Sequence, residues 1–408
     1  MLIFYGWWIV LSCFLIGLYV SSIVFFGFTA FIEPIIKEFG WSYAQVSFAS
    51  SLRGMEMGIF APFLGFLVDR LGSRKLMFFG VITVGLGLIL LSFTQSLAMF
   101  YLAFIFLSFG AGGCTSIVTM AVIANWFDKS AGKAFGLMAS GFGASGLFIP
   151  VIVWLIEVYH WRTTLILLGL GMWILGIPLA FMIRNTPEQY GYLPDGKSAE
   201  TAQSEIQSTE VTMTFREALM QKSFLYLSLA EFIRLMIVTA VVIHVMPYLS
   251  SIGIPRRTAG LVAAGIPLFS IIGRIGFGWL GDIFDKKNIM ILTFFLMGLG
   301  MMAFCYMHNL WMILLFLLLF PPSLGGTMVL RVSMLREYFG RDSFGKLLGV
   351  IMGAASLGGI VGPPLAGWIF DSRQSYHLIW LTFAASVGLA ILLVSKIESP
   401  KEESSQKA

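Results

Sequence analysis

Long apolar stretches follow one another along the whole sequence, and they constrain its fold more than any other feature. Glycine, proline and clusters of charge divide the chain into twelve such stretches, each roughly 20 to 28 residues long. A helix of roughly 20 apolar residues crosses a bilayer core about 30 Å thick and satisfies its own backbone hydrogen bonds there. The sequence therefore predicts an all-α membrane protein with twelve transmembrane helices. The expected spans are 7–32, 44–69, 75–95, 98–125, 132–157, 163–184, 223–250, 257–284, 288–307, 310–335, 345–371 and 376–396.

Charged residues are scarce, and most of them lie at the ends of these spans. Hydrophobic residues make up 58% of the chain and charged residues 12%, against about 45–50% and 25% in soluble domains. We therefore attribute the net charge of +5 to orientation in a lipid bilayer, and we expect no nucleic-acid partner. No spacing typical of a metal site, a catalytic nucleophile or a dinucleotide-binding loop stands out, so we expect neither an enzyme nor a cofactor or metal.

One long polar segment, residues 185–222, divides the chain into two halves of six spans. We expect an N-terminal half at 1–184, a linker at 185–222, a C-terminal half at 223–396 and a polar tail at 397–408. Thr214 and Glu217 have capping-box spacing, which predicts a short helix at the end of the linker. The halves also repeat one another, because seven residues have chemically equivalent residues 213 positions later. The pairs are Gly65/Gly278, Asp69/Asp282, Arg74/Lys287, Gly132/Gly345, Lys133/Lys346, Gly136/Gly349 and Pro150/Pro363.

The distribution of Lys and Arg indicates the orientation. If both termini are cytoplasmic, the cytoplasmic segments hold seventeen of the 26 basic residues and the opposite side holds five. Because basic residues are enriched in cytoplasmic loops, we expect a multi-pass protein of the plasma (inner) membrane with both termini inside. The remaining four arginines lie within the expected spans, and they are Arg53, Arg234, Arg274 and Arg331.

Two polar loops at equivalent places carry a resemblance to a known family. The run GFLVDRLGSRK at 65–75 resembles the loop signature of the major facilitator superfamily, and GWLGDIFDKK at 278–287 is a weaker form of it. Parallel six-helix repeats are also the build of that superfamily. The runs YGWW at 5–8 and NWFDKSAGKAFGLMASG at 125–141 are similar to the monocarboxylate transporter branch and its prokaryotic relatives, the oxalate/formate exchangers. The resemblance covers essentially the whole chain and implies the two-half fold of the superfamily.

Arg274 places a guanidinium inside an apolar span, eight residues before Asp282 and so roughly 12 Å from the helix end. Inserting an arginine at this depth of the bilayer costs roughly 2.5–3.5 kcal/mol of free energy. Such an arginine therefore normally faces a cavity, an ion or a partner. Its planar fork can donate two parallel hydrogen bonds to a carboxylate. In the branch that the sequence resembles, this position carries the substrate arginine; the alternative is an internal salt bridge. Further residues predicted to contact substrate are Phe26, Phe28, Phe142 and Ser356.

The repeated loops predict a gate on the cytoplasmic side that holds the two halves together during part of a transport cycle. Their alternative role is to cap helices and fix topology. The predicted gate residues are Gly65, Asp69, Arg70, Gly72, Arg74, Lys75, Gly278, Asp282, Lys286 and Lys287.

Three residues are candidates to carry a proton. Glu56 and Glu231 each have an arginine three residues away, a spacing that also suits a structural ion pair. His244 lies near the outer end of its span and is more simply a hydrogen-bonded helix-end residue. Animal relatives of the branch carry an acid one turn before the substrate arginine, where this chain has Ser270. The mode of proton coupling therefore stays open.

These features predict a secondary active transporter of small monocarboxylates such as lactate or pyruvate, moved with a proton by alternating access. A single central cation, with Ala355 where the oxalate exchangers have a second one, suits a monoanion. Two alternatives remain. One is a proton-independent organic-anion exchanger of the oxalate/formate type, and the other is a membrane receptor or assembly subunit that transports nothing.

Overall fold

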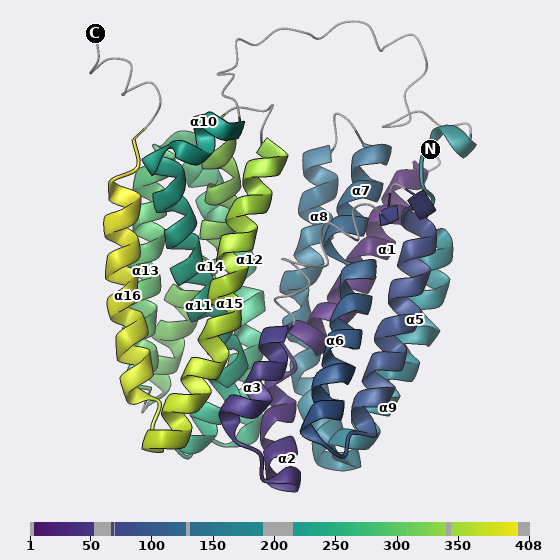
Figure 1. Cartoon of the computed structure of the whole chain (residues 1–408), viewed down its shortest axis with the longest axis vertical. Coiled ribbons are helices and arrows are strands. Elements are labelled where there is room, and N and C mark those ends of the chain that lie inside the picture. Colours follow the sequence, from purple (N-terminus) through teal and green to yellow (C-terminus); the bar gives the residue numbers. More distant parts are fainter. Residues whose placement is uncertain are drawn as a thin grey trace, which may run out of the picture. The chain divides into compact units, whose positions relative to one another are not determined.

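The computed structural model describes residues 4–52, 67–68, 70–127, 131–190, 215–307, 309–339 and 344–398, and all regular secondary structure in these ranges is helical. The chain divides into two compact units. The first comprises Met1–Trp41 and Leu52–Ile206, and the second comprises Ser42–Ser51 and Gln207–Ala408. Long helices that run side by side build each unit (Figure 1).

The helices of the first unit follow the predicted spans. The first span begins as an α-helix, continues as one π-helical turn and ends in a second α-helix. The elements are α1 (Tyr5–Val20), η1 (Ser21–Phe25), α2 (Thr29–Phe39), α5 (Ser73–Ser92), α6 (Leu97–Cys114), α7 (Ser116–Trp126), α8 (Ala131–Ala144), η3 (Ser145–Phe148), α9 (Ile149–Met182) and η4 (Glu188–Tyr190).

The helices of the second unit match the predicted spans within a few residues. Each of the six expected spans of the C-terminal half is one continuous helix, and the short helix expected at the end of the linker is present as α10. The elements are α3 (Tyr43–Leu52), α10 (Phe215–Met220), α11 (Lys222–Ser251), α12 (Arg256–Ile283), α13 (Lys286–Cys305), α14 (Leu310–Phe339), α15 (Phe344–Arg373) and α16 (His377–Ser395).

The helix count agrees with twelve spans. In the part of the chain that the structure describes, ten helical segments are long and apolar enough to cross a membrane. One of them, Lys133–Met182, is broken at His160, whose φ of 69° and ψ of 153° are not helical. This break falls between the expected spans 132–157 and 163–184, so the segment accounts for both. The expected span 44–69 begins as α3.

The internal repeat is visible in the helix boundaries. Helix α5 begins at residue 73 and α13 at 286, α6 begins at 97 and α14 at 310, and α8 begins at 131 and α15 at 344. Each pair is 213 residues apart, which is the offset found in the sequence. The equivalent helices of the two halves therefore start at equivalent positions, as expected for a duplicated bundle.

Helix α3 belongs to the second unit although it precedes most of the first unit in the chain. Its backbone N–H groups at Tyr43 and Ala44 donate to the carboxylate of Asp371 at 3.1 and 2.9 Å. Gly367 lies so close to it that a Cβ there would be 2.7 Å from the Ala44 nitrogen. The sequence assigns residues 1–184 to one half, whereas the structure packs 42–51 with the other.

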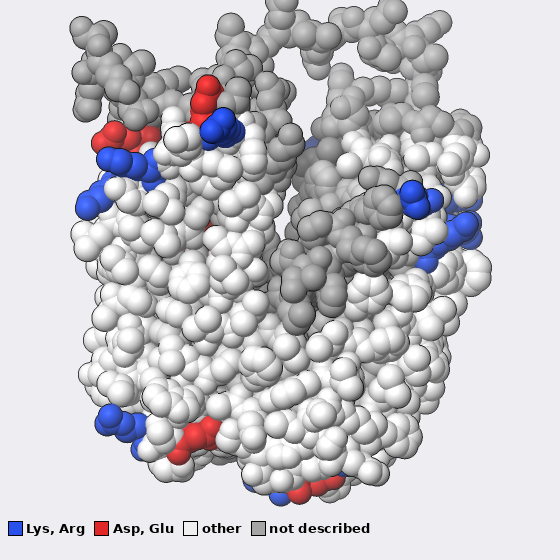
Figure 2. All heavy atoms as spheres, viewed as in Figure 1, with Lys and Arg blue, Asp and Glu red and all other residues white. Residues whose placement is uncertain are grey.

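Apolar side chains cover the outer faces of the helices. Leu102, Ile174 and Ile275 are 67%, 71% and 71% exposed, each within a membrane-length helix. Figure 2 shows most of the visible Lys, Arg, Asp and Glu near the ends of the helices, with uncharged side chains between them. An apolar surface bounded by charge is suited to a bilayer, and the chain is an integral, multi-pass membrane protein.

Candidate functional site

Arg274 lies on the interior side of α12. Ser270, one turn before it on the same face, is fully buried. The opposite face carries Ile272, Ile275 and Trp279, which are 61%, 71% and 63% exposed. Arg274 itself is half-buried. The helix therefore turns its guanidinium-bearing face toward the interior of the second unit, and its bulky apolar face is exposed on the surface of that unit, as suits a functional arginine at this depth.

Close packing between α12 and α14 holds the backbone at Arg274. A Cβ at Gly273 would lie 1.8 Å from the carbonyl oxygen of Pro322, and a Cβ at Gly325 would lie 3.0 Å from the Arg274 nitrogen. Farther along, a Cβ at Gly281 would lie 2.6 Å from the side chain of Leu330. The contacts advance along both helices in the same direction, so α12 and α14 are parallel. Glycines at the contact let the two backbones approach, as is common between membrane helices.

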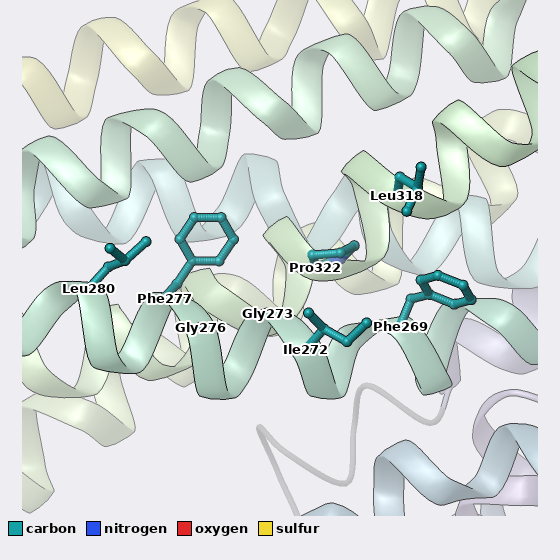
Figure 3. Close-up of a pocket in the computed structure, with 8 residues that line it drawn as sticks. All are labelled: Phe269, Ile272, Gly273, Gly276, Phe277, Leu280, Leu318 and Pro322. Atoms are coloured by element: carbon teal, nitrogen blue, oxygen red, sulfur yellow. The ribbon is translucent and has the colours of Figure 1, made fainter.

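A shallow apolar groove of about 270 Å³ lies along the same two helices (Figure 3). Two of its lining residues, Ile272 and Leu318, are about 60% exposed, so the groove opens on the surface of the second unit. Arg274 does not line it, and none of the described residues that do is charged. The lining residues are Phe269, Ile272, Gly273, Gly276, Phe277, Leu280, Leu318 and Pro322.

Glu231 on α11 forms a buried ion-pair cluster with two arginines. Arg234 Nη2 lies 2.7 Å and Arg331 Nη1 2.8 Å from Glu231 Oε2. The pair between Glu231 and Arg234, predicted from their spacing, is thus confirmed, but the sequence does not reveal Arg331 as the second partner. Helix α11 packs mainly on α15, and α14 packs on α12 and α13, so this ion pair connects two helices that are not close neighbours. The one available signal is that Glu231, Arg234, Arg274 and Arg331 lie well inside the spans of this half, whereas its other acids lie at span ends.

His244 is fully buried and has three polar neighbours. Its Nε2 lies 2.9 Å from both the Pro363 carbonyl oxygen and Ser47 Oγ, and its Nδ1 lies 2.9 Å from the Tyr376 hydroxyl. Since the carbonyl can only accept, Nε2 carries the proton and Nδ1 accepts from Tyr376. This arrangement suits a neutral imidazole that joins α11 to α3 and α15. His244 remains a proton-carrier candidate, but its hydrogen bonds already account for its burial.

The predicted aromatic residues occupy different surroundings within the first unit. Phe28 is buried with its ring 4.7 Å from that of Phe104. Phe142 lies 6.0 Å from Phe25 in an edge-on arrangement. Phe26 is half-buried at the end of the π-helical turn. Their role as substrate contacts stays a prediction, and the packing of Phe28 against α6 is equally that of a core residue.

Ser356, the remaining predicted substrate contact, lies on α15 in the second unit. It is 4% exposed, and its hydroxyl donates to the Gly353 carbonyl at 2.7 Å. A serine hydroxyl bonded to its own helix can still accept from a ligand. Its role in substrate binding stays a prediction.

The gate residues of the second unit surround the start of α13. Lys286 pairs with Glu337 near the end of α14. Asp282 is exposed in the last turn of α12, whereas Gly278 and Lys287 are half-buried. The ion pair of Lys286 and the exposure of Asp282 are as consistent with capping helices and fixing topology as with gating. The gate therefore stays a prediction.

The gate residues of the first unit lie at the start of α5. Gly72 has φ of 79°, a conformation that favours glycine. Arg74 follows in the first turn, and its backbone N–H donates to the side-chain oxygen of Asn185 at 2.9 Å. Arg70 and Lys75 are exposed. This loop is thus bonded to the segment that follows α9.

Three predicted residues, Glu56, Gly65 and Asp69, lie outside the described residues. Their roles rest on the sequence alone.

The chain belongs to the Major Facilitator Superfamily, whose family model it matches over residues 14–273 and 227–408. The chain is a membrane transporter by family, and the members of that family are transporters rather than enzymes.

Individual relatives agree with this assignment. Monocarboxylate transporter 12 of Rattus norvegicus is 26% identical over 403 residues, which cover 92% of this chain and 82% of that one. The MFS-type transporter YcxA of Bacillus subtilis (strain 168) is 24% identical over 399 residues, covering 95% and 94%. A crystal structure of a bacterial homologue of the human lysosomal transporter Spinster superposes with a TM-score of 0.71 at 15% identity, covering 96% of this chain and 95% of that one. The last likeness shows the shared fold alone.

Proposed function

We propose that this chain is a secondary active transporter of small monocarboxylates of the lactate or pyruvate type, moved together with a proton by alternating access. The observation that carries the proposal is Arg274, a guanidinium at the interior face of an apolar, membrane-length helix. Relatives named as monocarboxylate transporters support the class of substrate. In this proposal the chain lies in the plasma (inner) membrane with both termini in the cytoplasm.

The chemistry of the site supports a monoanion. The guanidinium of Arg274 can donate two parallel hydrogen bonds to one carboxylate. Phe26, Phe28 and Phe142 would contact the short apolar part of the substrate, and Ser356 would supply a hydroxyl. Residues 1–184 and 223–396 would rock about the site, with the repeated loops at Asp69 and Asp282 closing the cytoplasmic side.

Transport by the purified protein in liposomes tests this function. We expect uptake of labelled lactate or pyruvate, greater than that of dicarboxylates, and stimulated by an inward proton gradient. Uptake that ignores the gradient would favour the proton-independent exchanger. Binding of a monocarboxylate without any flux would favour a receptor.

Substitution of Arg274 tests the site itself. We expect Arg274→Ala to abolish specific binding and Arg274→Lys to weaken it severely, because a point charge replaces the two-pronged donor. Loss of a desolvated charge-assisted pair costs on the order of 2–5 kcal/mol, or about 30-fold to several thousandfold in affinity. Arg257→Ala, an exposed arginine in the first turn of the same helix, is the matched control. Folded Arg274→Ala protein with wild-type affinity, measured by thermal-shift titration, would contradict the proposal.

A further inference from the structure

The two carboxylate oxygens of Glu231 differ in their hydrogen bonds. Oε2 accepts three hydrogen bonds, from Arg234 Nε at 2.9 Å, Arg234 Nη2 at 2.7 Å and Arg331 Nη1 at 2.8 Å. Oε1 is buried, and no donor among the described residues lies within hydrogen-bond distance of it. All three side chains are at most 5% exposed. A buried carboxylate oxygen without a donor is unfavourable, so a purely structural ion pair does not explain this geometry.

The cluster also carries a surplus of positive charge. Two guanidiniums face one carboxylate, and the other described acids of the second unit lie at helix ends. Glu217, Asp282 and Glu337 are exposed at helix ends, and Asp371 binds the start of α3. The charged and titratable residues on α11 and on the described parts of its neighbours are Lys222, Tyr226, His244 and Tyr248 (α11), Arg331, Glu337 and Tyr338 (α14), Arg216 and Glu217 (α10), Arg256, Arg257, Arg274 and Asp282 (α12), Tyr43 (α3), Asp371 and Arg373 (α15), and His377 (α16).

Arg331 is connected to the Arg274 region through α14. Gly325, which packs against the backbone of Arg274, precedes Arg331 by six residues, roughly 9 Å along the helix axis. Arginine side chains can span part of such a separation. Arg331 is therefore the member of the Glu231 cluster that lies on α14, the helix that packs against α12 at Arg274.

We propose that Glu231 is the proton-carrying carboxylate of the transport cycle, and that Arg331 makes its protonation depend on the substrate anion. This inference rests on the proposed function and adds the coupling residue to it. Without substrate, both guanidiniums keep Glu231 ionised. When a substrate carboxylate bound at Arg274 draws the guanidinium of Arg331 away, Glu231 loses a counter-charge and accepts a proton from the bulk solution on Oε1.

The exchange of partners accounts for coupling. One monoanion and one proton enter together, so the buried charge of the cluster is unchanged, and no covalent bond of the substrate is altered. Because linkage is reciprocal, a bound proton favours the anion to the same degree that the anion favours the proton. Among the described residues of the second unit, Glu231 is the acid that is buried inside a membrane-length helix.

The double variant Glu231→Gln with Arg234→Gln tests this inference. It removes the proton site, retains Arg331 for the anion and keeps the net charge of the cluster at +1. The measurements, in liposomes, are substrate-driven proton movement, followed with a pH-sensitive dye, and lactate counterflow. We expect proton movement to be lost while counterflow persists. Glu217→Gln, an exposed acid on α10, is the control and should retain both.

A second variant tests the inference if the double variant does not fold. Arg331→Gln leaves Glu231 and Arg234 as a neutral pair on one helix, so we expect it to fold. It should lose substrate-driven proton movement and bind lactate more weakly. Folded double variant that moves protons with lactate as the wild type does would overturn the inference. So would a folded double variant that loses counterflow together with proton movement, because the cluster would then serve binding in general. A wild-type protein that transports no monocarboxylate would instead refute the proposed function.

Discussion

The carboxylate of Asp371 accepts a hydrogen bond from the backbone N–H of Ala44 at 2.9 Å, although the two residues are 327 positions apart in the sequence. The bond joins the first turn of α3 to the end of α15 in the second unit. Unpaired N–H groups at a helix start favour a negatively charged partner. Asp371 therefore caps a helix to which it is connected only through tertiary structure.

Removing this cap should loosen α3 from the second unit. We expect Asp371→Ala to lower the free energy of unfolding by about 0.5–2 kcal/mol, the usual effect of losing a helix cap. Asp371→Asn, which keeps one acceptor oxygen, should lose less. Thermal unfolding of the detergent-solubilised variants measures the change, with the exposed neighbour Ser372→Ala as control. Equal stability of Asp371→Ala and wild type would show that the cap contributes nothing.

Gly273 should tolerate no side chain. Its Cβ would lie 1.8 Å from the Pro322 carbonyl oxygen, so Gly273→Ala must push α12 away from α14 and displace Arg274. We expect a loss of stability of roughly 1–3 kcal/mol, typical of overpacking, and weaker substrate binding. Gly276→Ala is the matched control on the same helix, because its Cβ would meet nothing within 4 Å. Similar melting temperatures for the two variants would contradict the close packing.

Substitution of Gly72 should also destabilise the protein, because of its backbone conformation. Its φ of 79° strains any L-residue, and a Cβ there would lie 2.7 Å from the side chain of Asn185. We expect Gly72→Ala to cost on the order of 1–3 kcal/mol, because φ of 79° with ψ of 150° lies in a region that residues other than glycine rarely occupy. Gly136→Ala on α8, whose Cβ would meet nothing within 4 Å, is the control. Thermal unfolding compares the two, and a Gly72→Ala protein as stable as the control would exclude backbone strain here.

Asp69 tests the proposed gate, although it lies outside the described residues. If the repeated loops act on conformational exchange, Asp69→Asn should slow turnover more than it weakens substrate binding. Counterflow rates and thermal-shift affinities separate these effects. A variant whose affinity collapses while its exchange rate holds would exclude the gating role.

The sequence was sufficient for the spans because lipid imposes a local rule. A backbone in a bilayer must satisfy its own hydrogen bonds, so apolar length alone predicts helices such as α12 and α13. The repeat at an offset of 213 likewise reappears in the helix boundaries. Local spacing also predicted the pair of Glu231 with Arg234, since residues three apart share a helix face.

The partners of these residues across the fold depended on tertiary structure. Nothing local connects Arg331 to Glu231 or Asp371 to Ala44, since each pair comes from different helices. The sequence also could not place α3 with the second unit, because an apolar helix face is complementary to many others. Apolar length and the placement of charge along the chain thus predicted which segments cross the membrane and which charges lie inside them. Only the packing of those segments decided which buried charges meet, because ion pairs between helices depend on distances that no local pattern encodes.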